Sequence, residues 1–74
     1  MLLMTITAAQ KFGKIVRQMR EERGWTQDDL AAELNADAAY ISRIENGKKN
    51  ASLETVLKLA SAFGVKVSFG DKRL

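Results

Sequence analysis

Four helical segments separated by turn residues divide this chain of 74 residues. A residue that can cap a helix opens each segment, and a Gly or Asn that tolerates a left-handed conformation closes it. The capping residues are Thr7, Thr26, Asp37 and Ser52, and the closing residues are Gly24, Asn35, Gly47 and Gly64. Thr7 and Gln10 also have the spacing of a capping box. The sequence therefore predicts four short helices.

Apolar residues recur at helical spacing within each segment and predict which faces form the core. They are Phe12, Ile15, Val16 and Met19, then Leu30, Ala31 and Leu34, then Ile41 and Ile44, and finally Leu53, Val56, Leu57, Ala60 and Phe63. We expect Trp25 to fill the space between the first two helices. A domain of this size buries only about 60% of the surface of its unfolded chain, and Cys is absent. Pairing with a second copy is therefore an expected source of stability.

The apolar pattern changes after the fourth segment. Val65, Val67 and Phe69 alternate with polar residues, which is typical of a half-buried strand. A lone strand cannot pair its own backbone groups. We therefore expect two copies to pair through residues 65–69, with Phe63 beneath, so that the dimer interface consists of Phe63, Val65, Val67 and Phe69.

The residue types that enzymes commonly use in catalysis are scarce. His and Cys are both absent, no Gly-rich phosphate loop is present, and the carboxylates lie where helix caps and helix starts explain them. We expect no catalytic residue, no cofactor-binding residue and no metal ligand, and therefore no enzyme. Twelve Lys and Arg against nine Asp and Glu give a net charge of +3, which is compatible with a polyanionic partner.

The apolar start of the chain, Met1 to Ile6, is much shorter than the roughly 20 residues of a membrane-spanning helix, and it has no basic leader. We expect no export segment, no membrane partner and a cytoplasmic location. The expected organisation is a disordered or extended tail at residues 1–6, one helical domain at 7–64, and a dimerisation strand and tail at 65–74.

The second and third segments are joined by a turn of about three residues, from Leu34 to Asp37. Two short helices joined in this way cross steeply. The outward residues of the third segment are small or polar, namely Ala38, Ala39, Ser42 and Arg43. A helix with such a face fits into a DNA major groove, which is about 12 Å wide. The pair is therefore predicted to be a DNA-binding helix-turn-helix.

The stretch from Gly24 to Val65 resembles the Xre and Cro-repressor family of bacterial and phage regulators. The motifs WTQDDLA, ISRIENGK and LETVLKLASAFGV follow one another in the order and spacing of that family. The resemblance implies an all-α, lambda-repressor-like DNA-binding domain of four to five helices. Family members usually continue with a fifth helix, whereas VKVSFGDK is similar to the strand of HipB-type antitoxins. That similarity implies a short C-terminal β-strand that pairs across a dimer.

The resemblance also implies roles for single residues. The residues implied to read bases are Ala38, Ala39, Tyr40, Ser42 and Arg43, and those implied to bind phosphates are Gln27, Asn46, Lys48, Lys49, Asn50 and Ser52. Arg20 and Glu45 match a structural ion pair. Arg43 suits guanine because its guanidinium matches O6 and N7. These roles have plainer alternatives. Asp37 also falls at a base-reading position of the family, where it could read cytosine, but we favour a helix cap. Tyr40 could bind a phosphate or pack, and Gln27, Arg43 and the loop after the third helix could simply be solvated.

We therefore expect a sequence-specific transcriptional repressor that binds an inverted repeat in double-stranded DNA as a homodimer. The C-terminal strand favours an antitoxin that represses its own operon, with a HipA-like kinase toxin as partner. Alternatives are a phage-type repressor or a restriction-modification controller. A further alternative is an adaptor that binds proteins but not DNA, which the Ala38 and Ala39 pair would favour. The cations of the first helix fit either a DNA flank or a solvated face.

Overall fold

The computed structural model describes residues 6–74, so that the expected N-terminal tail lies outside the described residues except for Ile6. The helices are α1 (Ala8–Glu22), α2 (Gln27–Glu33), α3 (Ala38–Glu45) and α4 (Leu53–Phe63), and the strands are β1 (Ser68–Phe69) and β2 (Lys72–Arg73). The predicted mainly helical fold with four helices is confirmed.

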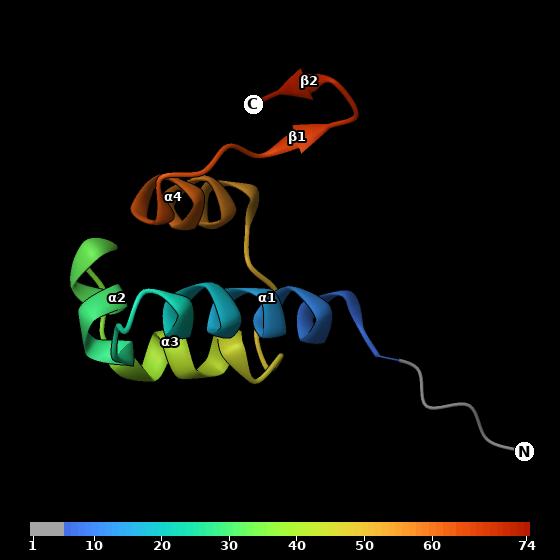
Figure 1. Cartoon of the computed structure of the whole chain (residues 1–74). Coiled ribbons are helices and arrows are strands. Elements are labelled where there is room, and N and C mark those ends of the chain that lie inside the picture. Colours follow the sequence, from blue (N-terminus) through green and yellow to red (C-terminus); the bar gives the residue numbers. More distant parts are fainter. Residues whose placement is uncertain (1–5) are drawn as a thin grey trace, which may run out of the picture.

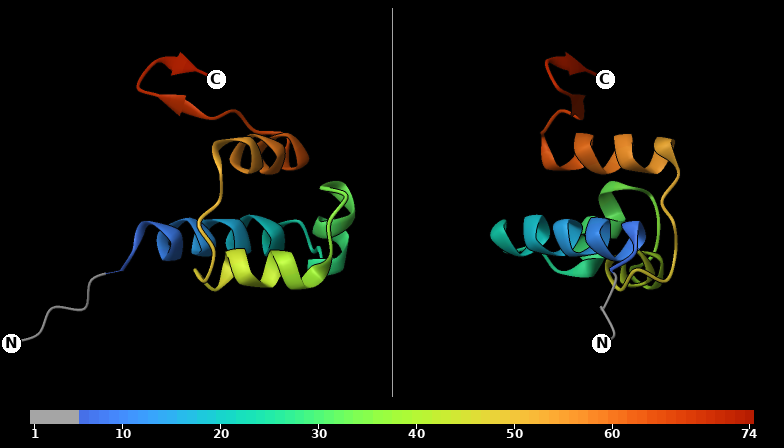
Figure 2. Two further views of the ribbon diagram at one scale, coloured as in Figure 1. Left: turned by 180° about the vertical axis from the view of Figure 1, so that it is seen from behind. Right: turned by 90° about the vertical axis from the view of Figure 1, so that its right-hand side faces the viewer.

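α1 is the central element of the fold. α3 and α4 lie along opposite sides of α1, and α2 crosses the end at which α1 finishes (Figure 1). The C-terminal hairpin lies on the far side of α4 from α1, and the views from behind and from the side agree with this arrangement (Figure 2). The turn between α2 and α3 therefore places α3 at an outer face of the molecule.

All four helices begin at the predicted capping residues. The hydroxyl of Thr7 accepts a hydrogen bond from the backbone N–H of Gln10, and the Gln10 side chain accepts one from the backbone N–H of Thr7. Thr26 and Asp29 form a second capping box, which the sequence had not predicted. Asp37 and Ser52 cap α3 and α4. Caps of this kind each contribute about 1 kcal/mol.

The core lies where α1, α3 and α4 face one another, with α2 against its end. Leu30, Ile41, Ile44 and Val16 are almost fully buried, as predicted. Leu59 is also buried, although the sequence pattern had pointed to its neighbours. Two glycines permit this packing. Gly64 ends α4 with φ +72, and a Cβ on Gly13 would lie 2.7 Å from the carbonyl oxygen of Glu45, so the backbones of α1 and α3 nearly touch.

Three residues predicted to face inward are exposed instead. Ile15 of α1 has 52% of its surface exposed, and Leu53 and Leu57 of α4 have 62% and 39%. The apolar face of α4 is wider than the strip that packs into the core, so that Leu53 and Leu57 stay in contact with solvent. The prediction that Ile15, Leu53 and Leu57 are core residues of the single chain is therefore wrong, although the helical spacing of the apolar residues predicted the helices correctly.

The C-terminal strand differs from the prediction in length and in partner. β1 covers only residues 68–69 and pairs with β2 of the same chain, Ser68 opposite Arg73 and Phe69 opposite Lys72. Gly70, with φ +60, occupies the first turn position, as a type II′ hairpin requires. β1 thus has a partner within the chain, because the chain folds back at Gly70, and the pairing of residues 65–69 across a dimer stays a prediction.

Candidate nucleic-acid interface

α3 presents an open face to solvent and is anchored from behind. Ile41 and Ile44 are 0% and 1% exposed and hold the helix against the core. On the opposite side, Ala39 and Arg43 are exposed, while Ala38 and Ser42 are half-buried. Asp37 accepts a hydrogen bond from the Tyr40 N–H at 2.8 Å, so its carboxylate acts as the helix cap. The small side chains leave this face free for close approach to another surface.

Tyr40, expected among the base-reading residues, is tied to the start of α4. Its hydroxyl lies 3.1 Å from the hydroxyl of Thr55, and its ring packs against the core. The ammonium of Lys49 lies 5.7 Å from the ring centroid, within the range of a cation–π contact. These contacts give Tyr40 a packing role that positions the loop between α3 and α4.

The loop after α3 carries most of the residues that were assigned to phosphate binding. Lys48, Lys49 and Asn50 are exposed, so their side chains are available to an anionic partner. Asn46 instead turns back onto α3, where its amide donates to the carbonyl oxygen of Ser42 at 2.8 Å. Ser52 caps α4. The structure therefore separates an exposed basic loop from two residues that hold it in place.

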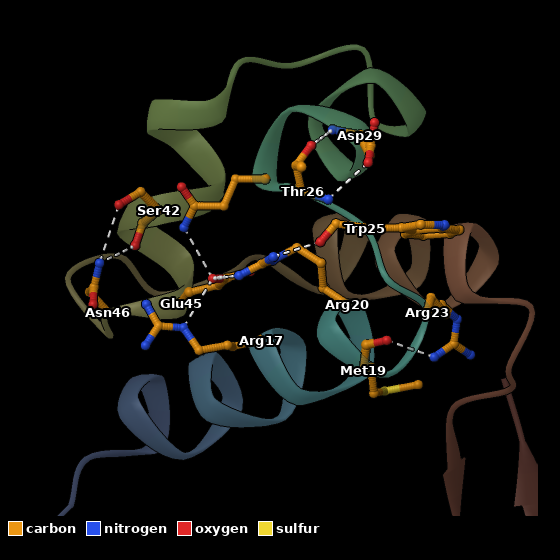
Figure 3. A network of polar contacts seen from close by, with 11 residues as sticks. Arg17, Met19, Arg20, Arg23, Trp25, Thr26, Asp29, Ser42, Glu45 and Asn46 are labelled. Carbon is orange, nitrogen blue, oxygen red and sulfur yellow. Dashed lines mark hydrogen bonds and ion pairs between the residues drawn. The ribbon is translucent and has the colours of Figure 1, made fainter.

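A buried carboxylate connects α3 to α1. Glu45, with no exposed side-chain surface, accepts hydrogen bonds from Arg20 Nε at 2.6 Å on Oε2 and from Arg20 Nη2 at 3.1 Å on Oε1. Arg20 also donates to the carbonyl oxygen of Trp25 at 2.7 Å. Figure 3 shows this network between the end of α3 and the side of α1. The pair implied by the resemblance is thus in ion-pair contact and fixes the end of α3.

Two further donors reach the same carboxylate. Arg17 Nε donates to Glu45 Oε1 at 3.3 Å, and Gln27 Nε2 donates to it at 3.1 Å. Burial raises the pKa of Glu45, but the hydrogen bonds from Arg20, Gln27 and Arg17, together with the charge of Arg20, outweigh burial and lower that pKa. The hydrogen bond to Glu45 also raises the pKa of Arg20. Sequence reasoning missed Arg17, although it lies one helical turn before Arg20.

Arg23 belongs to the core of the fold rather than to this face. Its guanidinium donates to the carbonyl oxygens of Met19 and Phe63, both at 2.8 Å, and lies 4.9 Å from the centroid of the Phe63 ring. Trp25 stacks on the same ring at 5.9 Å. Phe63, which was expected at a dimer interface, is only 7% exposed, so it has little surface to offer a partner.

Several large apolar side chains remain exposed, including Ile6 and Leu74 near the ends of the described residues. Five others lie on α1, on α4 or in the segment that follows α4, and we call them the exposed apolar set: Ile15, Leu53, Leu57, Val65 and Phe69. A shallow apolar pocket of about 70 Å³ lies between α1 and α4. Ile15 and Val67 line this pocket with core residues such as Phe12 and Leu59. None of these residues lies on α3, so the apolar surface is distinct from the open polar face.

Residues 6–74 contain no group of three or more Asp or Glu side chains that could hold a metal ion. Within the same range, the helices are too short or too polar to cross a membrane.

The chain matches a family model described as Helix-turn-helix over residues 16–69, which is more than half of its length. It is 36% identical over 59 residues to Control protein C.MunI from Mycoplasma sp, covering 78% of this chain and 80% of that protein. Some other matched regulators are longer, and the chain spans 40% and 47% of two of them.

Two solved structures are similar to most of this chain. The restriction-modification controller protein C.AhdI from Aeromonas hydrophila is 37% identical, with a TM-score of 0.73 and coverage of 77% of this chain and 83% of that one. The controller protein C.Esp1396I, solved as a tetramer in complex with its natural 35-base-pair operator, is 30% identical. Its TM-score is 0.74, and the match covers 82% of this chain and 80% of that one.

Proposed function

Because this chain belongs to the helix-turn-helix family of DNA-binding transcriptional regulators, we propose that it is a controller-type regulator that binds an inverted-repeat operator as a homodimer. The observation that carries the proposal is the open face of α3, with Ile41 and Ile44 buried behind it. In the proposed complex, the α3 helices of two copies enter successive major grooves about 34 Å apart. The protein then acts in the cytoplasm, with the DNA that it regulates.

The controller interpretation replaces the antitoxin interpretation. The antitoxin hypothesis depended on a strand that pairs across the dimer, and that strand pairs within the chain. The relatives described above include restriction-modification controllers of similar length. No observation supports a HipA-like toxin as partner.

The exposed apolar set supports a homodimer. Contiguous exposed apolar surface marks contact sites, and Ile15 and Val67 line the same apolar pocket between α1 and α4. The set lies on α1, on α4 and in the segment after α4, and none of its residues belongs to α3. A second copy could therefore cover it while both α3 helices stay accessible. Val65 and Phe69 of the expected interface belong to the set, whereas Phe63 lies beneath it in the core.

Roles on the DNA follow from chemistry and exposure. Arg43 is exposed on α3 and offers a planar donor fork, which suits the two acceptors of guanine. Ala38 and Ala39 offer methyl contacts only, so direct readout rests mainly on Arg43 and Ser42, with DNA shape contributing the rest. Lys48 and Lys49 are exposed in the basic loop and suit the phosphate backbone.

The test is to select preferred duplexes from a random pool and then to compare two variants on the selected operator. Arg43→Ala should lose about 1 to 3 kcal/mol of discrimination against a changed base at one position of each half-site. Lys48→Ala should weaken binding to every duplex alike and lower the salt dependence of the affinity. Lys58→Ala, an exposed cation of α4, is the matched control and should bind as the wild type does.

Two outcomes would contradict the proposal. Equal effects of Arg43→Ala and Lys48→Ala on all sequences would refute the separation of base-reading and phosphate-binding residues. A wild-type protein with no affinity for any duplex at low salt would favour the adaptor alternative, because the electrostatic part of DNA binding is strongest there.

A further inference from the structure

Arg17 and Gln27 belong to different helices and meet at one atom. Arg17 lies in α1 and Gln27 is the first residue of α2, yet both donate to Oε1 of Glu45, at 3.3 Å and 3.1 Å. The side chain of Glu45 has no exposed surface, whereas that of Arg17 is 47% exposed. The two donors therefore reach one oxygen of a buried carboxylate from different helices, and Figure 3 shows Arg17 reaching Glu45 from α1.

The charge of Glu45 is already balanced without Arg17. Arg20 makes two hydrogen bonds to the carboxylate, and its side chain is only 11% exposed. The single bond from Arg17 is the longest of the four that reach Glu45. Two guanidinium groups against one carboxylate leave one positive charge in excess, and this charge is carried by the more exposed group.

Most donors of Arg17 have no partner in the described part of the chain. A guanidinium has five N–H groups, and the only hydrogen bond of Arg17 to residues 6–74 uses Nε. The two terminal nitrogens therefore remain available to an acceptor. The amide of Gln27 uses one of its two hydrogens on Glu45, so a second hydrogen is available close by. Together they form a charged, multi-donor group that suits an oxyanion.

The position of this group relative to α3 identifies the oxyanion. Glu45 lies one helical turn after Ser42, which belongs to the open face of α3. Arg17 and Gln27 therefore flank that face instead of lying on it. When a helix occupies the major groove, the phosphate backbones run along both sides of it. A group beside the helix reaches phosphates, whereas a group on its outer face reaches bases.

We propose that Arg17 and Gln27 together hold a single backbone phosphate in each half-site, an inference that rests on the proposed function. Arg17 keeps its Nε on Glu45 and supplies charge through its terminal nitrogens, and Gln27 supplies a neutral hydrogen bond to the same phosphate. Glu45 brings the two together from beneath. A phosphate contact of Gln27 was implied by the family resemblance, whereas the role of Arg17 and the shared phosphate arise from the structure.

The test uses operator duplexes in which one phosphate at a time is replaced by a neutral methylphosphonate. For the wild type, one linkage in each half-site should weaken binding when it is neutralised. Arg17→Ala and Gln27→Ala should each bind the unmodified operator about tenfold more weakly. Arg17→Ala should lose most of its sensitivity to neutralisation of that linkage, whereas Gln27→Ala should keep it, because the charge of Arg17 still faces the same phosphate.

The two variants should differ in their salt dependence. Loss of Arg17 should lower the slope of log affinity against log salt by about 0.9 for each half-site, while loss of the neutral Gln27 leaves the slope unchanged. Lys58→Ala removes an equal charge from α4 and should change neither the affinity nor the linkage pattern. Arg17→Gln, which keeps a polar side chain, is the second variant if circular dichroism shows that Arg17→Ala has lost helix.

An unchanged salt slope for Arg17→Ala and Arg17→Gln would overturn the proposal, as would an Arg17→Ala protein that stays fully sensitive to neutralisation of that linkage. A failure of the proposed function would have a different signature, because the wild type itself would then bind no duplex at low salt.

Discussion

At the scale of single residues, Glu45 couples stability to pH. The hydrogen bonds that hold it lower its pKa below the ordinary value of 4.5, despite its burial. A carboxylate of this kind stabilises the fold at pH values above its unfolded pKa, and the contribution is lost as the pH falls through its folded pKa. Glu45→Gln also leaves the buried Arg20 without a counter-ion. We expect this variant to lower the free energy of unfolding by about 3 kcal/mol near neutral pH.

Urea unfolding of wild type and Glu45→Gln over a range of pH measures this effect. The difference between their free energies of unfolding should be constant from about pH 7 to about pH 5 and should shrink below that, since protonation removes the charge from the wild type too. Glu33→Gln changes an exposed carboxylate of α2 and should alter stability by at most about 0.5 kcal/mol. A difference that persists unchanged to about pH 3 would show that the charge of Glu45 is not the stabilising feature.

At the scale of elements, the contact between α1 and α3 depends on the missing side chain of Gly13. Ala is favoured over Gly inside a helix by about 1 kcal/mol, so propensity alone predicts that Gly13→Ala stabilises α1. A Cβ at this position would instead lie 2.7 Å from the carbonyl oxygen of Glu45, and closer still to that of Ile44. Backbone atoms cannot move aside as a flexible side chain can. We therefore expect Gly13→Ala to destabilise the protein by about 1 to 3 kcal/mol.

Thermal and urea unfolding would detect that loss. The matched control is Gln18→Ala, which places the same side chain at an exposed position of α1 and should change stability by at most about 0.5 kcal/mol. Because α1 and α3 would be forced apart, Gly13→Ala should also weaken operator binding through the displaced Glu45 network. A stabilised Gly13→Ala protein would mean that the two helices can separate at little cost.

The elements that the sequence predicted best are those that local chemistry determines. Thr7 and Ser52 begin their helices because each satisfies an amide three residues away, and this can be read from neighbouring residues alone. Which strip of α4 is buried depends on the path of α1, so Leu59 was missed and Leu57 was overestimated. β2 was missed because a strand of only two exposed, charged residues, Lys72 and Arg73, has no apolar alternation.

In the candidate site, too, contacts that depend on how the helices pack could not be predicted from the sequence. The Arg20 and Glu45 pair was accessible through the family resemblance. The convergence of Arg17 and Gln27 on Glu45 could not be predicted in this way, because it depends on how three helices approach one another and on the directions of long side chains. The exposed face of α3 was predictable, since the apolar residues Ile41 and Ile44 define its buried side.

At the scale of the whole molecule, the proposed DNA-binding face and the proposed dimer interface use different residues. The open face of α3 carries no large apolar side chain, whereas Leu53, Leu57 and Phe69 are 62%, 39% and 73% exposed elsewhere. Burial of apolar surface contributes about 25 cal/mol for each Å² removed from water. A second copy that covers this surface would therefore gain stability without competing with DNA for the same residues.

The corresponding variant is Leu57→Lys, which places a charge in the proposed interface at a position outside the buried core cluster. Sedimentation should show a dimer for the wild type and a monomer for the variant. The variant should bind a duplex with one half-site as tightly as the wild type does. It should bind the full inverted repeat more weakly by a factor of about 100 or more, because the two half-sites are no longer bound by one linked dimer.

The control is Lys58→Ala, at the next position of α4, which should remain dimeric. A dimeric Leu57→Lys protein with full operator affinity would place the interface elsewhere, whereas loss of half-site binding would mean that Leu57 supports the fold itself.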